Sequence, residues 1–337
     1  MKVFNKSLLV LFVSLFVSNV FAQSTYEDAV KLYNSAAEQA SAKEYDKAIS
    51  TYMEAAKIGE ELGTPQGTDI KSRSEQQIPK VQLNKAGNLF NAFRSSKQIA
   101  DLDVAIAAFE ETVKMGKEYE DTRVTQAAQG YVPQLYYQKA TMLFKREMYQ
   151  EADNALNSAI QANANYAQPY YTKGLVAKKL SDDINDALRW FDQAIAVADK
   201  TNKGQISRQA KNAAHDELLF RGSKLIESKN YSDAIDLLKL ATEYDAESAD
   251  VYYRIAEAYN KQSKYDLAIS NAKTALTHEK GGKTDKAKIY FEMGFAYQMK
   301  GNKSDACSAY TNASFGSFKA PAEHSMEFEL KCGTTTN

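Results

Sequence analysis

Residues 251–276 read VYYRIAEAYNKQSKYDLAISNAKTAL, with tyrosine and alanine at fixed offsets and no histidine, cysteine or glycine. In the first half, apolar residues recur at i, i+3, i+4 and i+7, namely Tyr252, Ile255, Ala256 and Tyr259. This spacing is typical of an amphipathic helix. A similar pattern follows the polar run Lys-Gln-Ser. The stretch therefore predicts two helices that are joined by a short turn.

The same offsets recur along the chain as three columns of small residues. The first column holds Ala36, Ala86, Ala140, Gly174, Gly222, Ala256 and Gly294. The second holds Ala48, Ala105, Ala152, Ala187, Ala234, Ala268 and Ala306. The third holds Ala55, Thr112, Ala159, Ala194, Ala241, Ala275 and Ala313. Three such columns predict seven repeated units, each a helix-turn-helix hairpin.

Larger side chains lie between the second and third columns in most units. They are Tyr52, Phe109, Leu156, Phe191, Leu238 and Tyr310, with Ala272 as the exception. A small residue lets two helix backbones approach closely, and a large neighbour fills the space beside it. We therefore expect the small columns to mark the places where the helices of each hairpin cross.

These columns resemble the tetratricopeptide repeat (TPR), a 34-residue helical hairpin with alanine, glycine and aromatic residues at set positions. Units that begin near Pro133 and Ala167 are about 34 residues apart, as are those near His215 and Ala249. The resemblance implies an all-α fold, a right-handed TPR α-solenoid of about seven repeats with a C-terminal capping helix. The family proline after the second helix is replaced here by Ala164 and Ala246.

The expected solenoid covers residues 23–319. Its repeats lie near residues 29–62, 79–118, 133–166, 167–201, 215–248, 249–282 and 287–319. About seven extra residues, around Arg94 to Asp101, are expected between the helices of the second repeat. Longer insertions near residues 59–78, 115–132 and 200–214 are expected to extend second helices.

The N-terminus has the pattern of a secretory signal peptide. Lys2 and Lys6 precede an apolar run from Leu8 to Phe21, and Ala22 offers a small-residue cleavage site. The alternative is a membrane anchor, but a run of about 14 residues is shorter than the ~20 that span a bilayer. We expect cleavage after Ala22 and an exported protein, periplasmic or secreted, with no transmembrane anchor in the mature chain.

Residues 320–337 are expected to form a capping helix and tail, because the last hairpin of an array needs its apolar edge covered. Phe328 and Leu330 are the apolar residues expected on that helix. Cys307 and Cys332, the two cysteines of the chain, flank this segment. An oxidising compartment favours a disulfide between them. The alternative is two unpaired buried thiols.

Composition and motifs argue against several functions. Removal of residues 1–22 leaves 40 basic residues against 43 acidic ones, a net charge of −3, with no block of like charges. Such a balance does not favour nucleic acid as a partner. His215, His278 and His324 are far apart, with no second ligand at metal-binding spacing. We expect no metal, no cofactor and no enzymatic activity. Trp190 is interpreted as a packing residue rather than a ligand-stacking one.

Aromatic or aliphatic doublets in the first helices give the functional hypothesis. The first member of each doublet belongs to the expected buried stripe, and the second is rotated by about 100°. The doublets are Tyr136-Tyr137, Tyr170-Tyr171, Leu218-Leu219, Tyr252-Tyr253 and Tyr290-Phe291. The residues in the register of the second member are Tyr33, Leu83, Tyr137, Tyr171, Leu219, Tyr253 and Phe291. They could face a concave groove, or they could serve general packing. TPR proteins that bind acidic chaperone C-termini have lysine and asparagine there, so the resemblance does not extend to that activity.

We therefore expect an exported scaffold or adaptor that binds a protein or peptide of unknown identity through an aromatic-lined groove. The partner-binding candidates are Tyr33, Tyr137, Tyr171, Tyr253 and Phe291. The alternative is an accessory protein that binds a small ligand or a glycan, with the same tyrosines stacked on sugar rings.

Overall fold

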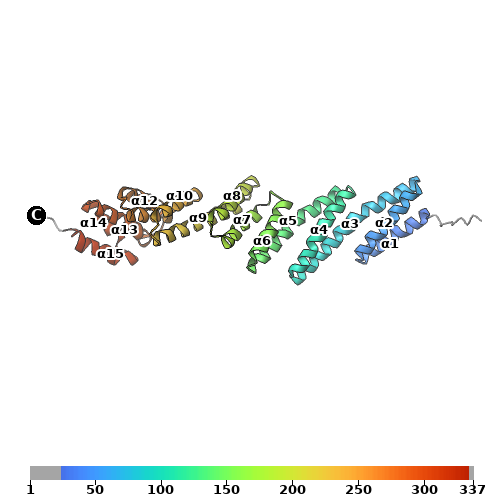
Figure 1. Ribbon diagram of the computed structural model, residues 1–337, viewed down its shortest axis with the longest axis horizontal. Coiled ribbons are helices and arrows are strands. Elements are labelled where there is room, and N and C mark those ends of the chain that lie inside the picture. Colours follow the sequence, from blue (N-terminus) through green and yellow to red (C-terminus); the bar gives the residue numbers. More distant parts are fainter. Residues whose placement is uncertain (1–23, 334–337) are drawn as a thin grey trace, which may run out of the picture. The chain divides into compact units, whose positions relative to one another are not determined.

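The computed structural model describes residues 24–333, and these residues form helices with no strand. The expected signal peptide, residues 1–22, lies outside them. The chain divides into two compact units between Val132 and Pro133. Figure 1 labels helices of both units. No helix of the described part combines the length and the hydropathy that crossing a membrane requires. The all-α prediction is confirmed.

The N-terminal unit is built from two helical hairpins and the first part of a further helix. Its helices are α1 (Tyr26–Ser41), α2 (Tyr45–Leu62), α3 (Pro65–Ser96), α4 (Ile99–Glu118) and the beginning of α5 (Thr122–Lys145). Helix α1 packs against α2, α2 against α3 and α3 against α4, and the first helices α1 and α3 also contact each other. The hairpins are therefore stacked through their first helices.

The C-terminal unit continues the same pattern. After the end of α5 come α6 (Tyr149–Ala162), α7 (Ala167–Leu180), α8 (Ile184–Lys200), α9 (Gly204–Glu227), α10 (Tyr231–Tyr244), α11 (Ala249–Lys261), α12 (Tyr265–His278), α13 (Lys283–Met299) and α14 (Lys303–Ala313). Consecutive helices pack together, and α7, α9, α11 and α13 contact one another in series. First helices thus form one layer of this unit, and second helices lie behind them.

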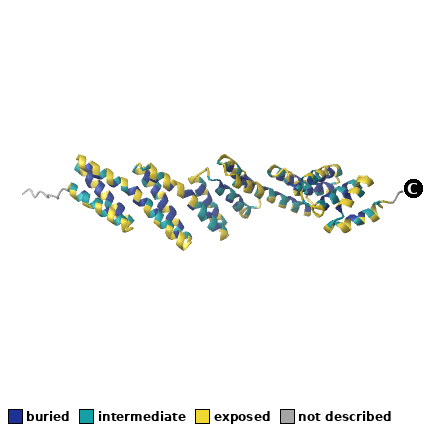
Figure 2. Ribbon diagram, turned by 180° about the vertical axis from the view of Figure 1, so that it is seen from behind, coloured by how far each residue is buried: buried dark blue, intermediate teal, exposed yellow. Residues whose placement is uncertain are grey.

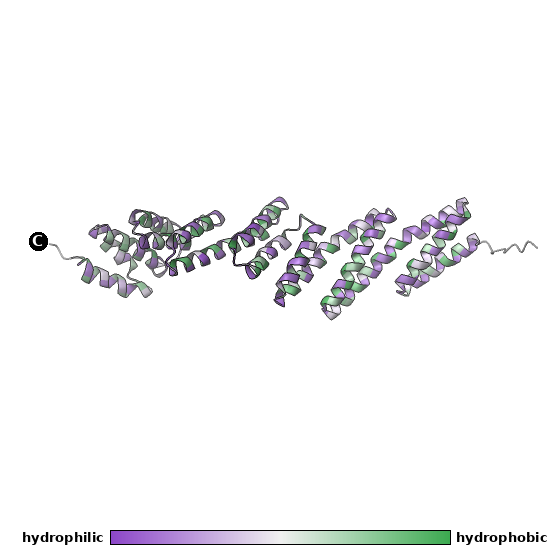
Figure 3. Cartoon of the chain, viewed as in Figure 1, coloured by the Kyte–Doolittle hydropathy of each residue, from purple (hydrophilic) through white to green (hydrophobic). Residues whose placement is uncertain are grey.

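The core of each hairpin lies where the small columns were expected. Every alanine and threonine of the three columns is at most 1% exposed, and the column glycines are buried too. Figure 2 shows the buried residues along the inner sides of the paired helices and the exposed residues on their outer sides. Figure 3 shows the matching stripes of hydropathy on single helices. Burial of apolar surface between helices is what stabilises the stack.

Two glycines show why the first column is small. A Cβ on Gly222 would lie 2.7 Å from Leu238 Cγ, and one on Gly294 would lie 2.9 Å from Tyr310 Cδ1. Leu238 and Tyr310 are the large residues expected to fill the space at the crossing. Real Cβ atoms essentially never come within 3.0 Å of such neighbours. Glycine is therefore required by close packing at these positions.

The insertions are placed differently from the prediction. They extend second helices only in part; most of their length is added to the start of the next first helix, as in α3, α5 and α9. At the first insertion Gly63 is left-handed with φ 60°, Thr64 Oγ1 accepts from Gly67 N at 3.1 Å, and Pro65 begins α3. The expected extra residues in the second repeat are helical as well, with only Lys97 and Gln98 between α3 and α4.

The C-terminal cap is helical and is joined to the last hairpin. It consists of η1 (Gly316–Phe318), α15 (Lys319–His324) and the π-helical η2 (Ser325–Glu329). Ala322 is buried against Tyr310, with Met326 and Leu330 packed beside it. Phe328 does not cover the apolar edge as expected, because its ring is 68% exposed and lies beside His324 instead. The inward positions of the cap are therefore 322, 326 and 330.

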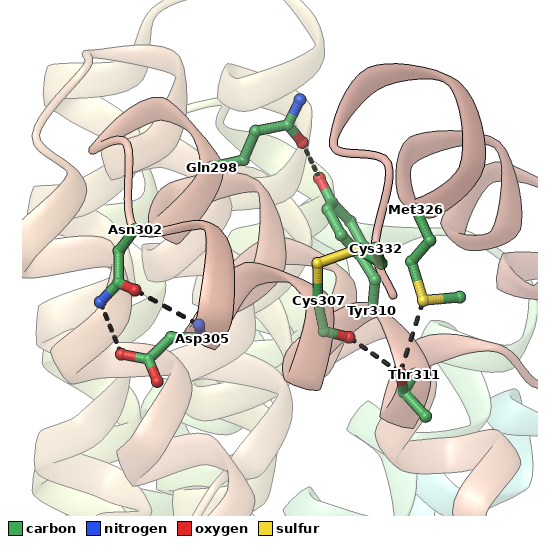
Figure 4. Close-up of a disulfide and its surroundings, with 8 residues drawn as sticks. All are labelled: Gln298, Asn302, Asp305, Cys307, Tyr310, Thr311, Met326 and Cys332. Atoms are coloured by element: carbon green, nitrogen blue, oxygen red, sulfur yellow. Dashed lines mark hydrogen bonds between the residues drawn. A yellow bond between two sulfur atoms is a disulfide. The ribbon is translucent and has the colours of Figure 1, made fainter. Parts of the chain in front are cut away.

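Cys307 of α14 and Cys332 after the cap form a disulfide, with Cα atoms 5.8 Å apart (Figure 4). Beside it, Tyr310 donates its hydroxyl proton to Gln298 Oε1 at 2.7 Å. Thr311 Oγ1 lies 3.4 Å from Met326 Sδ, between α14 and η2. The bond closes a segment of 25 residues, so the cap is covalently held to the hairpin that it covers.

Candidate functional site

The predicted partner-binding residues all lie on first helices, as the doublets require. Tyr33 is on α1, Tyr137 on α5, Tyr171 on α7, Tyr253 on α11 and Phe291 on α13. Four of them are partly buried, and Tyr253 is buried with 9% exposure. None of the five is a fully exposed side chain, so each has to be judged from its contacts.

In the N-terminal unit, Tyr33 packs inside its own hairpin. Its ring lies 5.4 Å from the Tyr52 ring in an edge-on arrangement. The Arg73 guanidinium of α3 lies over the Tyr33 ring at 4.8 Å. Tyr33 therefore joins α1 to α2 and α3, which is the packing alternative of the sequence analysis.

In the C-terminal unit, Tyr137 and Tyr171 also make packing contacts. The Tyr137 ring is 5.4 Å from the Tyr166 ring, and Thr172 Oγ1 donates to its hydroxyl at 3.5 Å. The Tyr171 ring is 6.1 Å from the Phe191 ring of the second helix. Burial raises the pKa of the Tyr171 hydroxyl above its ordinary value. Both residues fix neighbouring helices to each other.

Phe291 contacts the last second helix and the cap. Its ring centroid lies 5.5 Å from Tyr310 and 5.4 Å from Phe318 of η1. These contacts bring the beginning of the cap onto the layer of first helices. Phe318 is consequently placed next to the region around Tyr253, a position that sequence reasoning did not single out.

Tyr253 lines a pocket of about 300 Å³ that crosses three first helices, the Tyr253 pocket. Its lining residues are Leu219, Ser223, Asp250, Tyr253, Arg254, Lys288 and Phe318. They come from α9, α11, α13 and η1. Two of the predicted second-doublet positions, Leu219 and Tyr253, thus meet in one pocket. The charged residues and Phe318 were missed, because the doublet pattern selects only apolar positions on helices.

The Tyr253 pocket has an aromatic floor and a rim of mixed charge. Arg254 Cζ and Lys288 Nζ lie 5.2 and 5.3 Å from the centre of the Tyr253 ring. Arg254 is paired with Glu257 at 2.7 Å, and Lys288 is paired with Asp250. Burial, with the charge of Glu257 nearby, raises the pKa of Tyr253 to about 12. The tyrosine therefore stays neutral and can take part in hydrogen bonding.

A second pocket, of about 400 Å³, lies in the N-terminal unit and is called here the Tyr131 pocket. Its lining residues are Leu83, Gly87, Phe90, Asn91, Arg94, Phe109, Ala127 and Tyr131. Leu83 is again a second-doublet position on a first helix. Tyr131 and Gly87 were not among the predicted site residues, because Tyr131 lies in an insertion and Gly87 follows the small column by one residue. Phe109 was predicted only as a packing residue.

A third pocket, of about 710 Å³, is lined by residues of α8, α9 and α10. Its walls combine both charge signs, with Arg189, Asp192, Lys211 and Glu243. Tyr244 donates its hydroxyl proton to Asp192 Oδ1 at 2.8 Å, and burial with this carboxylate raises the Tyr244 pKa. No repeat column pointed to this pocket, because its lining residues belong to none of the three columns.

Trp190, which was interpreted from the sequence as a packing residue, lies among core residues and cations. Trp190 is partly buried against the core, with Lys173 Nζ 4.4 Å and Arg189 Cζ 5.3 Å from its ring. Within residues 24–333, no three side chains of His, Cys, Asp or Glu are grouped so that they could hold a metal ion. The candidate binding sites described here are therefore the pockets.

No protein-family model matches this sequence, and a comparison with curated proteins finds no match. Similar solved structures are TPR proteins. YrrB, described as "a TPR protein with an unusual peptide-binding site", is 17% identical over 58% of this chain and 91% of its own, with a TM-score of 0.34. MamA is 18% identical over 59% of this chain and 97% of its own, with a TM-score of 0.35.

The TPR2AB domain of yeast Sti1, in complex with pHSP90, is 14% identical. It covers 91% of this chain and 97% of its own, with a TM-score of 0.30. These values are too low to transfer the binding sites of the neighbours to this chain.

Proposed function

We propose that this protein is an exported, non-enzymatic scaffold that binds a segment of another protein along the layer of first helices. The observation that supports the proposal most is that the Tyr253 pocket crosses α9, α11 and α13 in the C-terminal unit. A ligand in it touches three successive hairpins at once. Such a surface suits a chain-like ligand better than a compact one.

The arrangement of three neighbouring first helices around the pocket suits an extended peptide. Packed helices lie about 8–10 Å apart, so three first helices span roughly 16–20 Å. An extended chain rises about 3.3 Å per residue, so five or six residues would cross them. The apolar floor of Leu219, Tyr253 and Phe318 can take side chains, and the polar rim can take backbone groups.

The export part of the proposal rests on the N-terminal pattern and agrees with the disulfide. A bond between Cys307 and Cys332 persists in an oxidising compartment outside the cytoplasm. Fractionation of the cells that make the protein, with mass spectrometry of its N-terminus, tests this part. We expect a mature chain that begins at Gln23. A protein that keeps residues 1–22 would contradict export by cleavage.

Site-specific photocrosslinking in the producing cells tests the binding function. A photoreactive amino acid replaces Ser223, in the Tyr253 pocket, or Ser270, an exposed serine of the second helix α12. We expect protein adducts of discrete mass from position 223 and not from position 270. Equal labelling from both positions would contradict a specific site. Adducts that resist protease but disappear with glycosidases would favour the glycan-binding alternative.

A further inference from the structure

We propose that the Tyr131 pocket is a second binding site, specific for an acidic segment of a partner protein in which an aromatic side chain neighbours a carboxylate side chain. This inference rests on the proposed function, since the ligand is a protein segment. It uses residues of the N-terminal unit only, so it can fail independently of the Tyr253 pocket.

The aromatic half of the pocket is already assembled. The Phe109 ring is buried and forms the floor, and the Tyr131 ring is stacked on it at 4.7 Å with an interplanar angle of 23°. The Phe90 ring lies 6.2 Å from Tyr131 at a tilt of 59°. Tyr131 stays 44% exposed although it is large and apolar. An aromatic side chain placed here would complete the cluster and shield this exposed ring.

Gly87 keeps the pocket open. A Cβ at this position would meet nothing within 4 Å, whereas the column glycines are crowded by large side chains. Gly87 lies within the 32-residue helix α3, where glycine is less favourable than alanine. Neither close packing nor a positive φ requires it. The absence of a side chain leaves room beside Phe90 and Tyr131 for a ligand.

Arg94 supplies the charge selectivity. Its side chain lines the pocket, is exposed, and has no hydrogen bond or ion pair with any residue between 24 and 333. No acidic residue lines the pocket, and the neighbouring polar residue is Asn91. A cation in the last turn of α3 is also favourable to the helix dipole, but that interaction leaves its N–H donors free. A guanidinium with free donors fits a carboxylate in a bidentate manner.

Three short peptides test the chemistry on the full mature chain. The first is acetyl-Gly-Glu-Phe-Gly-amide with a fluorinated phenylalanine, followed by ligand-observed ¹⁹F NMR. The second replaces Glu by Gln, and the third is acetyl-Gly-Gln-Phe with a free C-terminal carboxylate. We expect the first peptide to bind and the second to bind about tenfold more weakly, as the loss of a charge-assisted hydrogen bond implies. Equal binding of the first two, or binding of the third alone, would overturn the proposal.

Matched variants locate the binding. Arg94→Gln should weaken the Glu peptide about tenfold, while Arg123→Gln removes an equal charge from an exposed position outside the pocket and should change nothing. Gly87→Leu should abolish binding without lowering the thermal midpoint, because it fills the pocket and improves helix propensity. Retained binding in Gly87→Leu would overturn the site. Photocrosslinking from position 223 in the Gly87→Leu variant tests the Tyr253 pocket by itself, so a failure of the Tyr131 pocket can be told apart from a failure of the proposed function.

Discussion

Tyr252 and Tyr253 are adjacent in sequence but lie in different environments. Tyr253 is buried with Ala256 and Ile289, and it forms the floor of its pocket. Tyr252 is only partly buried, with its ring stacked 5.9 Å from His278. This is the reverse of the expected order, in which the first tyrosine was the buried one. The reason is that α11 packs on two sides, against α12 and against α13, and residue 253 is near α13.

The two tyrosines should therefore respond differently to truncation. Tyr253→Ala should lower the free energy of unfolding by ~3–5 kcal/mol, as large-to-small changes in a core do. Tyr252→Ala should cost less, because part of its ring is already in water. Urea denaturation of both variants measures the difference. A larger loss for Tyr252→Ala would contradict the burial described here.

Glycines of the first column and Gly87 should behave in opposite ways. Gly174→Ala should destabilise by ~1–3 kcal/mol, because a Cβ there collides with the Phe191 ring, which is buried. Gly87→Ala should stabilise by up to ~1 kcal/mol, because its Cβ meets nothing and alanine is the better helix former. Thermal unfolding of the two variants gives the comparison. The interpretation of the column fails if both substitutions shift the midpoint in the same direction.

At the scale of helices, periodicity predicted which segments pair, but not where each helix begins. The hairpins α7–α8 and α11–α12 follow the 34-residue pattern closely. The helix boundaries within the insertions could not be predicted from this pattern. An alanine-rich or lysine-rich stretch can continue one helix or begin the next with similar propensity. Gly63, Thr64 and Pro65 were nevertheless a readable signal, since a left-handed glycine, an N-cap threonine and an N1 proline mark a helix boundary.

The contact between α11 and α13 contains a titratable group. Glu292 Oε2 accepts from Asn260 Nδ2 at 2.7 Å, and Asn260 also donates to the Glu292 carbonyl at 2.9 Å. Burial, and to a smaller extent Glu257, raises the pKa of Glu292 above its ordinary value, although Asn260, Lys261 and Arg254 act in the other direction. Folding therefore makes the charged form of Glu292 less favourable than it is in the unfolded chain.

This raised pKa predicts a pH-dependent effect of Glu292→Gln. A carboxyl with a raised folded-state pKa costs no stability below its unfolded value of about 4.5, and its cost grows as pH rises through the folded-state value. The glutamine variant should match the parent near pH 4 and be more stable than the parent at neutral pH. Its Oε1 can still accept from Asn260. Melting curves of the variant and the parent at both pH values measure the difference in stability. A variant that is less stable than the parent at neutral pH would contradict a raised pKa of Glu292 in the folded protein.

At the scale of the whole chain, the sequence allowed the hairpins and the cysteine pair to be predicted. It did not show which side chains of neighbouring hairpins come together. The small columns and the repeat spacing predicted seven hairpins, and the cysteine positions nominated the pair that the structure joins. Of the residues in the second-doublet register, Leu83, Leu219 and Tyr253 line pockets, and the predicted binding role of these positions stays a prediction. Arg94, Lys288 and Phe318 were missed, because their roles depend on which hairpins stack beside them and no local pattern encodes that.

The division at Val132 and Pro133, together with contacts mainly between neighbouring hairpins, predicts that damage at one end stays local. Replacing both Cys307 and Cys332 with serine removes the disulfide without leaving a reactive thiol. A closed loop of 25 residues contributes about 3 kcal/mol in the chain-entropy description, and the loss falls on the cap and on α14. Met326 and Leu330 should then leave Tyr310 more often, exposing the edge of the last hairpin.

Hydrogen exchange of the full chain measures whether loss of the disulfide loosens only the cap and the last hairpin. Amides of α13, α14 and α15 should exchange faster in the double serine variant, because a stack of repeats opens from an unsupported end. Amides of α1 to α4 should keep the parent rates, because these helices belong to the other unit. A uniform acceleration from α1 to α15 would mean that the chain unfolds as one cooperative block. In that case the disulfide would stabilise the entire fold rather than the hairpin to which it holds the cap.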